Sequence, residues 1–155
     1  MANIDVNLVT GKRKIGSFYI AAVFLLLSLS ACVSIPVTYF DIATYSNLTG
    51  LKAEMTLLVE SFDYRSFEDN AGRIEDAVLN FRKAYEFEKG KGAGNSDTVK
   101  QFDKIFGLFA DDVKDYRESG PGAFGAVYFQ EAAKVLGEAF DIAISTENLK
   151  NKGRR

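Results

Sequence analysis

The chain has 155 residues, with 19 lysines and arginines against 21 aspartates and glutamates, and no histidine or tryptophan. The net charge of −2 argues against nucleic-acid binding driven by bulk positive charge. The lack of histidine removes the commonest catalytic base and imidazole-ligated metal sites. The single cysteine, Cys32, excludes an intrachain disulfide and a cysteine-rich zinc site.

The first thirty-two residues follow the order of an export signal. The basic residues 12–14 precede an uncharged apolar run that extends over residues 15–29. That run is shorter than the roughly 20 residues that a membrane-spanning helix needs. It ends in Leu29-Ser30-Ala31-Cys32. The pattern predicts a cleavable signal peptide over residues 1–31.

The sequence Leu29-Ser30-Ala31-Cys32 resembles the lipobox of bacterial lipoproteins. In that family the signal is cut before the cysteine, which carries acyl chains such as palmitate, so the resemblance implies lipidation at Cys32. Several acyl chains, at about 0.8 kcal/mol per buried CH₂, would form a lasting membrane anchor. Two alternatives stay open: an uncut signal-anchor helix from residue 15 to residue 37, and a cysteine that follows an apolar stretch by coincidence.

The residue after Cys32 is Val33 rather than aspartate. In enteric-type lipoproteins an aspartate there resembles an inner-membrane retention signal, so the resemblance favours the outer membrane, facing the periplasm. Residues 32–38 are predicted to form a lipid-anchored tether. The stretch 39–54 resembles the mature start of small uncharacterised helical lipoproteins of bacteria, and this resemblance implies no particular activity.

Four segments of the mature chain repeat apolar residues at helical spacing. In the first, an apolar stripe runs from Leu48 to Phe62 and extends upstream to Ile42, with Asp41 as N-cap. The second begins after the predicted N-cap Ser66, with Asp69 as its acidic partner three residues later. We expect the glycines at 90 and 92 to end this second helix.

The third segment carries a stripe from Val99 to Tyr116, with Ser96 as the predicted N-cap, and Gly120-Pro121-Gly122 is expected to end it. In the fourth, the predicted core stripe is Phe124, Tyr128, Ala132, Val135, Ala139 and Ile142, widened by Leu136, Phe140 and Ala143. No stretch alternates with the period of two that a strand requires.

The predicted fold class is therefore all-α, an antiparallel up-down-up-down four-helix bundle over residues 39–149 behind the signal peptide. A three-helix bundle with the first helix docked elsewhere is the alternative. Residues 150–155 form a basic tail. Because about ten residues separate Cys32 from the first helix, and an extended chain spans at most about 3.5 Å per residue, the domain is expected to lie close to the bilayer.

An up-down order gathers lysines and arginines at the expected membrane end. These residues are predicted to contact anionic lipid headgroups: Lys89, Lys91, Lys150, Lys152, Arg154 and Arg155. The alternative interpretation is that cations at helix C-termini only complement the helix dipole. A run of carboxylates at Asp111, Asp112 and Asp115 is interpreted as a solvated helix face, with cation binding as the alternative.

The sequence contains no recognisable catalytic constellation, and no cofactor is expected. We expect a non-enzymatic, lipid-anchored envelope protein that serves as an interaction or accessory module with a protein partner and no nucleic acid. A carrier of a small apolar molecule inside the bundle is the alternative binding function, and an enzyme that uses carboxylates alone is the third. An interaction module predicts a packed core, and a carrier predicts a lined cavity. An enzyme predicts clustered carboxylates that point inward.

Overall fold

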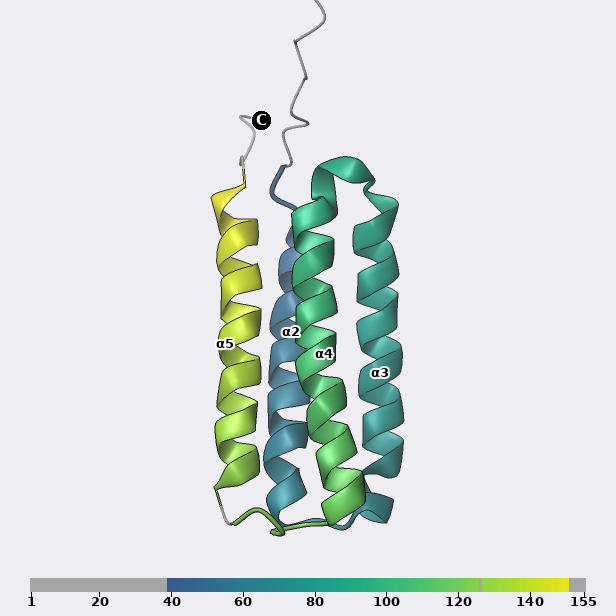
Figure 1. Cartoon of the computed structure of the whole chain (residues 1–155). Coiled ribbons are helices and arrows are strands. Elements are labelled where there is room, and N and C mark those ends of the chain that lie inside the picture. Colours follow the sequence, from purple (N-terminus) through teal and green to yellow (C-terminus); the bar gives the residue numbers. More distant parts are fainter. Residues whose placement is uncertain (1–38, 126, 151–155) are drawn as a thin grey trace, which may run out of the picture. The chain divides into compact units, whose positions relative to one another are not determined.

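A computed structural model describes residues 39–125 and 127–150, all of which belong to one compact unit, Pro36–Arg155. Four long α-helices lie side by side (Figure 1): α2 (Ile42–Glu60), α3 (Phe67–Gly90), α4 (Ser96–Ser119) and α5 (Tyr128–Leu149). Two short 3₁₀ turns, η2 (Ser61–Asp63) and η3 (Ala93–Asn95), lie in the connections. The described residues contain no strand, so the predicted all-helical fold with four helices is confirmed.

The helix starts follow local capping chemistry. The side chain of Asp41 accepts a hydrogen bond from the backbone N–H of Ala43, and that of Ser66 accepts one from Asp69, so both predicted caps are confirmed. The Ser96 cap was wrong by one position, because α4 begins at Ser96 and Asn95 precedes it. Asn95 forms no capping bond, since its side chain is used elsewhere.

Glycines end the middle helices as expected. Gly92 follows α3 with φ of +82°, and Gly120 follows α4 with φ of +77°, a region that L-residues with a side chain rarely adopt. The predicted start of the last helix near Phe124 was wrong. Gly125 also has a positive φ, and α5 begins only at Tyr128.

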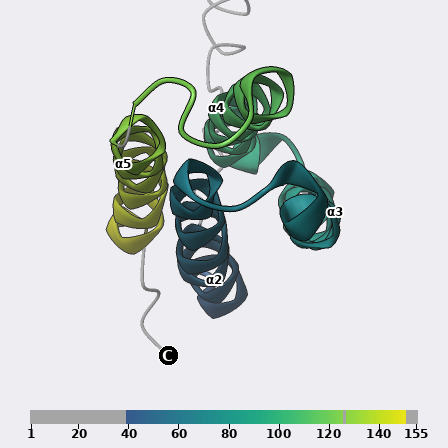
Figure 2. The ribbon, with the colours of Figure 1, turned by 90° about the horizontal axis from the view of Figure 1, so that it is seen from below.

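Seen along their axes in Figure 2, the helices surround a common interior. Aromatic side chains fill one end of it: the rings of Phe62 and Tyr116 stack with centroids 4.0 Å apart, and Phe129 meets Phe62 edge-on at 5.4 Å. α2 contributes fully buried residues such as Leu48 and Met55 to the same core. The first helix is therefore part of the packed domain, not docked elsewhere.

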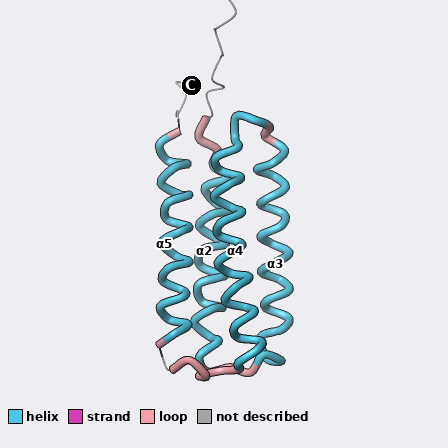
Figure 3. The backbone as a smooth tube through the Cα atoms, viewed as in Figure 1, coloured by secondary structure: helices cyan, strands magenta, loops and turns pink. Residues whose placement is uncertain are grey.

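Hydrogen bonds identify which helix ends lie together. At one end, Asn70 near the start of α3 donates to Tyr116 near the end of α4, and Asp63 accepts from the backbone of Phe129 in the first turn of α5. At the opposite end, Asp41 at the start of α2 bonds to Glu147 near the end of α5. Figure 3 shows the connecting loops confined to these two ends.

Candidate functional site

A buried carboxylate lies in the last turn of α3. Glu88 is fully inaccessible to solvent, and its two oxygens are both occupied: Oε1 accepts from the Thr44 hydroxyl at 2.7 Å and Oε2 from the Asn95 amide at 2.7 Å. The ammonium group of Lys91 lies 3.2 Å from Oε1. Burying a charge is costly unless it is paired and hydrogen-bonded, and these three partners meet that requirement.

Lys91 connects this carboxylate to the start of α2. Its ammonium group lies 2.9 Å from Oδ2 of Asp41 and also contacts the Thr44 hydroxyl. The hydrogen bond from Lys91 holds the pKa of Asp41 below its usual value. One lysine therefore bridges the end of α3 and the capping residue of α2.

A second buried pair lies at the end of α5. Glu147 is fully inaccessible, and its Oε1 accepts a 2.7 Å hydrogen bond from the backbone N–H of Asp41. Its Oε2 pairs with Lys150 at 2.6 Å. Lys150 also donates to Asn95 and to Thr98 of α4, at 2.9 and 3.0 Å. All four helices therefore contribute to one polar end cluster, made of Asp41, Thr44, Glu88, Lys91, Asn95, Thr98, Glu147 and Lys150.

The end cluster engages two of the lysines that are predicted to contact lipid headgroups. The Lys150 side chain is only 8% exposed and that of Lys91 24%, because both neutralise buried glutamates. Lys89 is 48% exposed and pairs with Glu86 on the same helix. Lys152, Arg154 and Arg155 lie outside the described residues, as does Cys32, so the headgroup prediction now depends mainly on Lys89 and on these three.

Sequence reasoning missed the two buried glutamates, although a signal was present. Glu88 follows Phe81 and Ala84, and Glu147 follows Phe140 and Ala143, each at the spacing that continues a buried stripe. A glutamate on the apolar face of a helix, with a lysine three residues later, is a pattern that predicts a buried ion pair. Both oxygens of each glutamate lie against a donor or an ammonium group, an arrangement typical of a structural role.

A groove of about 460 Å³ lies between α4 and α5, at the end where α5 begins. Apolar side chains supply most of its lining, with two carboxylates among them: Leu108, Asp112, Phe124, Val127, Tyr128, Glu131, Ala132 and Val135. The Tyr128 hydroxyl donates to Asp115 at 2.9 Å, and the rings of Phe124 and Tyr128 lie 4.6 Å apart. The groove therefore has an aromatic end with an acidic edge.

Asp112 departs from the predicted solvated face. Burial in the apolar groove, together with the nearby carboxylates of Asp115 and Asp111, raises its pKa to about 6. Asp111 itself is exposed, as expected. The three aspartates thus share one helical turn but differ in their surroundings. Asp112 faces the groove, and none of the ion pairs among the described residues includes it.

The predicted core stripe of the last helix was wrong. The buried residues of α5 include Leu136, Phe140 and Ala143, which are predicted only as the margin of the stripe, and Phe129, which the prediction does not include. Part of the predicted stripe is exposed, in a row with one residue every seven positions: Tyr128 at 37%, Val135 at 50% and Ile142 at 62%, continued by Leu149 at 84%. We call these four residues the α5 row.

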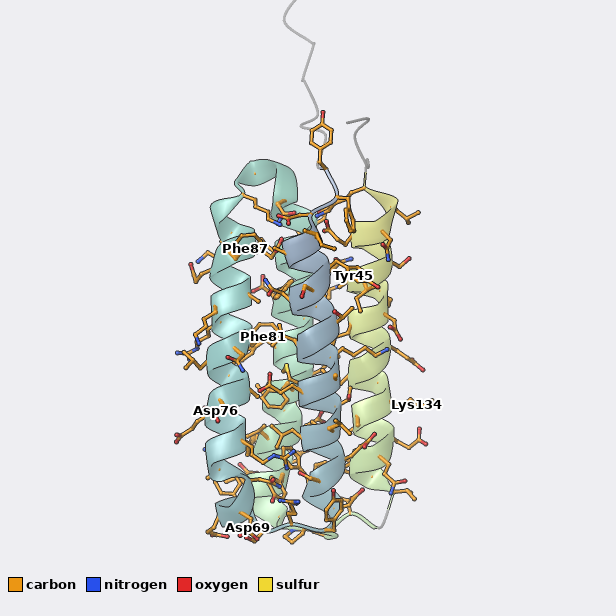
Figure 4. The ribbon with its side chains drawn as sticks, turned by 180° about the vertical axis from the view of Figure 1, so that it is seen from behind. Tyr45, Asp69, Asp76, Phe81, Phe87 and Lys134 are labelled. Atoms are coloured by element: carbon orange, nitrogen blue, oxygen red, sulfur yellow. The ribbon has the colours of Figure 1, made fainter. Side chains whose placement is uncertain are left out.

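Two further hollows lie between α3 and α4. One, of about 410 Å³, is lined by Phe81, Tyr85 and Phe106 together with charged groups of both signs. The other, of about 210 Å³, has Lys114 and Arg117 at its edge. In Figure 4 the labelled Phe81 points between the helices, whereas Asp76 and Lys134 point away from them.

Within residues 39–125 and 127–150, no three acidic or cysteine side chains are grouped so that they could hold a metal ion. None of the described helices is long and apolar enough to cross a membrane. No protein-family model, curated protein or solved structure matches this chain.

Proposed function

We propose that this protein is a lipoprotein of the bacterial envelope, anchored through Cys32, whose helical domain binds a protein partner and catalyses no reaction. The order of basic residues, apolar run and Leu29-Ser30-Ala31-Cys32 supports the anchor. The proposed parts are a signal peptide over 1–31, a tether over 32–38, the helical domain over 39–149 and a basic tail over 150–155. Val33 favours the outer membrane and the periplasmic face.

We propose that the domain is an up-down-up-down bundle. Contacts at its two ends support this order: Asp41 meets Glu147 at one end, and Asn70 meets Tyr116 at the other. In this arrangement the start of α2 lies at the end of the domain that the tether enters. Anchoring at Cys32, ten positions before Ile42, would keep that end near the membrane.

The α5 row is the observation that best supports partner binding. Apolar residues that recur every seven positions along one helix are typical of a face that packs against another helix. In this domain three of the four side chains are at least half exposed. A row of exposed apolar residues that begins beside a groove favours a protein-interaction surface.

Two other features favour binding over the alternatives. The inward carboxylates, Glu88 and Glu147, are each neutralised by a lysine, which leaves them no free oxygen for acid–base work. The large core side chains, such as Phe102, Phe109 and Phe140, belong to one cluster of buried residues, and a packed core of this kind disfavours the carrier.

The anchor is tested by expressing the tagged full chain in a bacterium fed an alkyne analogue of palmitate. We expect Cys32 to be required for labelling and for recovery in the membrane fraction. Intact-mass measurement should show loss of residues 1–31 in the wild type and their retention in Cys32→Ser. Labelling that persists in Cys32→Ser would overturn lipidation, and an unlabelled wild type that retains residues 1–31 in the membrane would favour the signal-anchor alternative.

Partner binding is tested separately with a photo-crosslinking amino acid placed in living cells at Val135 or at Leu79. The two side chains are equally exposed, at 50% and 51%, but Leu79 lies on α3. We expect a discrete crosslinked protein from position 135 only. Identical patterns from the two positions would count against a binding face on α5.

A further inference from the structure

We propose that the groove between α4 and α5, together with the α5 row, binds an amphipathic helix of the partner whose polar flanks carry lysine and arginine. This inference rests on the proposed function and specifies the surface and the chemistry of the partner.

The shape of the surface fits one added helix. The α5 row extends from Tyr128 to Leu149, about 30 Å at 1.5 Å per residue. Its spacing of seven residues repeats every two helical turns, the interval at which a neighbouring helix presents its own apolar side chains. Leu108 of α4 and Ala132 of α5 line the same groove, and the small alanine leaves room for an incoming apolar side chain. An amphipathic helix is the segment that offers such a row.

The charge of the surface selects a basic helix. Both charged residues that line the groove are acidic, Asp112 from α4 and Glu131 from α5. Asp115 lies beside Tyr128 at its edge, and Glu138 lies on the exposed side of α5. The cations near the groove are Lys134, which already pairs with Glu131 at 3.7 Å, and Lys104, one turn before Leu108. Farther along the α5 row, Lys52 and Lys150 are already paired with Asp141 and Glu147, each at 2.6 Å. The excess of carboxylates favours a cationic partner, and like charges would be repelled.

The same features disfavour two other occupants. A second copy packed antiparallel along the α5 row would centre between Val135 and Ile142, which would bring Glu138 of each copy together. An anionic membrane surface would be repelled by Asp112, Asp115 and Glu131. The hollows between α3 and α4 differ, because basic residues such as Arg82 and Lys114 contribute to their lining.

The test uses two fluorescent synthetic peptides of 18 residues, with leucine at the apolar heptad positions and either lysine or glutamate at all others. The full chain is reconstituted in nanodiscs of zwitterionic lipid, and binding to empty nanodiscs is subtracted. We expect the lysine peptide to bind at least tenfold more tightly than the glutamate peptide. Val135→Lys and Ile142→Lys should each raise its Kd about tenfold, and Asp112→Asn several-fold.

Leu79→Lys and Asp76→Asn are the matched controls on α3, and both should leave the Kd unchanged. Circular dichroism checks that each variant keeps its helical content. Equal binding of the two peptides, or equal weakening by Leu79→Lys and Val135→Lys, would overturn the proposal. A wild-type dimer that Val135→Lys makes monomeric would assign the surface to a second copy instead. If the peptide test fails but crosslinking at Val135 succeeds, only the basic helix is rejected. If the peptide test and the crosslinking test both fail, partner binding is rejected as well.

Discussion

The backbone N–H of Asp41 donates a 2.7 Å hydrogen bond to the side chain of Glu147, 106 positions later in the sequence. This contact joins the capping residue of the first described helix to the last turn of the final one. It places a fully buried carboxylate where four helix ends meet. The stability of this end therefore depends on the lysine that neutralises that carboxylate.

Lys150→Met should be strongly destabilising. The substitution leaves Glu147 buried without its cation, and breaking a buried pair on one side costs about 3 to 5 kcal/mol. Urea denaturation followed by circular dichroism gives the free energy of unfolding. Lys89→Met, at an exposed pair, is the control and should change little. The double variant Glu147→Met with Lys150→Met should recover most of the loss, and a double variant as unstable as Lys150→Met would contradict this explanation.

Asp112→Asn should stabilise the domain in a pH-dependent way. Well below pH 3.8 Asp112 is protonated in both the folded and the unfolded chain, so its neutral form fits the groove without cost. Because burial raises its folded pKa to about 6, that favourable contribution is lost as the pH rises through 6. Asparagine stays neutral throughout. Since Asp112 is only partly buried, we expect a gain of about 1 to 2 kcal/mol at pH 7.5 and none at pH 3.5.

Thermal unfolding at both pH values measures this difference. The titrating neighbours are Asp111 and Asp115 on α4 and Glu131 on α5. Asp76→Asn, at an exposed position of α3, serves as the control for removing one negative charge. A gain of equal size at pH 3.5 and 7.5 would show that the titration of Asp112 is not its source.

Tyr116→Phe should lower stability without a change in shape. The hydroxyl accepts from the Asn70 amide at 3.1 Å and donates to the backbone carbonyl of Arg65 at 2.8 Å. Removing it leaves a buried amide donor with one partner fewer, a loss of about 1 to 3 kcal/mol. Tyr64→Phe, at a side chain that is 71% exposed, should be neutral. Chemical denaturation distinguishes the two, and an equally neutral Tyr116→Phe would mean that these bonds contribute nothing net.

Ser66→Ala and Ser96→Ala should differ, although both serines lie at helix starts. Ser66 caps α3 through the backbone N–H of Asp69, and its loss should cost about 1 kcal/mol. Ser96 is already the first residue of α4 and caps nothing, so its substitution should have a much smaller effect. Equal losses measured by urea denaturation would be inconsistent with the helix boundary at Ser96.

Sequence periodicity was sufficient for helix number and for most boundaries. The stripe from Leu48 to Phe62 and most of the stripe in α4 became core, whereas Ile42, the predicted upstream extension, is 68% exposed. Periodicity failed in α5, where apolar residues cover too wide an arc for spacing alone to choose the buried side. Packing against α2 determines which side is buried. A Cβ atom added at Gly137 would lie 3.6 Å from side-chain atoms of Thr56 and Lys52 of α2. The side of α5 that carries Gly137 therefore faces α2, and the α5 row faces outward.

The candidate sites were harder to predict than the fold. Charge counting treated Lys91 and Lys150 as unpaired cations, because it could not show that they pair with Glu88 and Glu147, which lie inside the domain. Asp112 was expected to share the solvated face of Asp111, but it lines a groove with apolar residues that include Tyr128 and Val135 of α5. The glutamates carry a local signal, the lysine three residues later. The surroundings of Asp112 depend on contacts between α4 and α5, which local spacing does not encode.

The end cluster also has a mechanical meaning for an anchored protein. Under the proposed anchoring at Cys32, any pull between the membrane and a bound partner enters the domain at Asp41. That residue is held directly to α5 through Glu147 and to α3 through Lys91. Under that anchoring, tension would therefore be divided among several helices at its point of entry instead of peeling α2 away from the others.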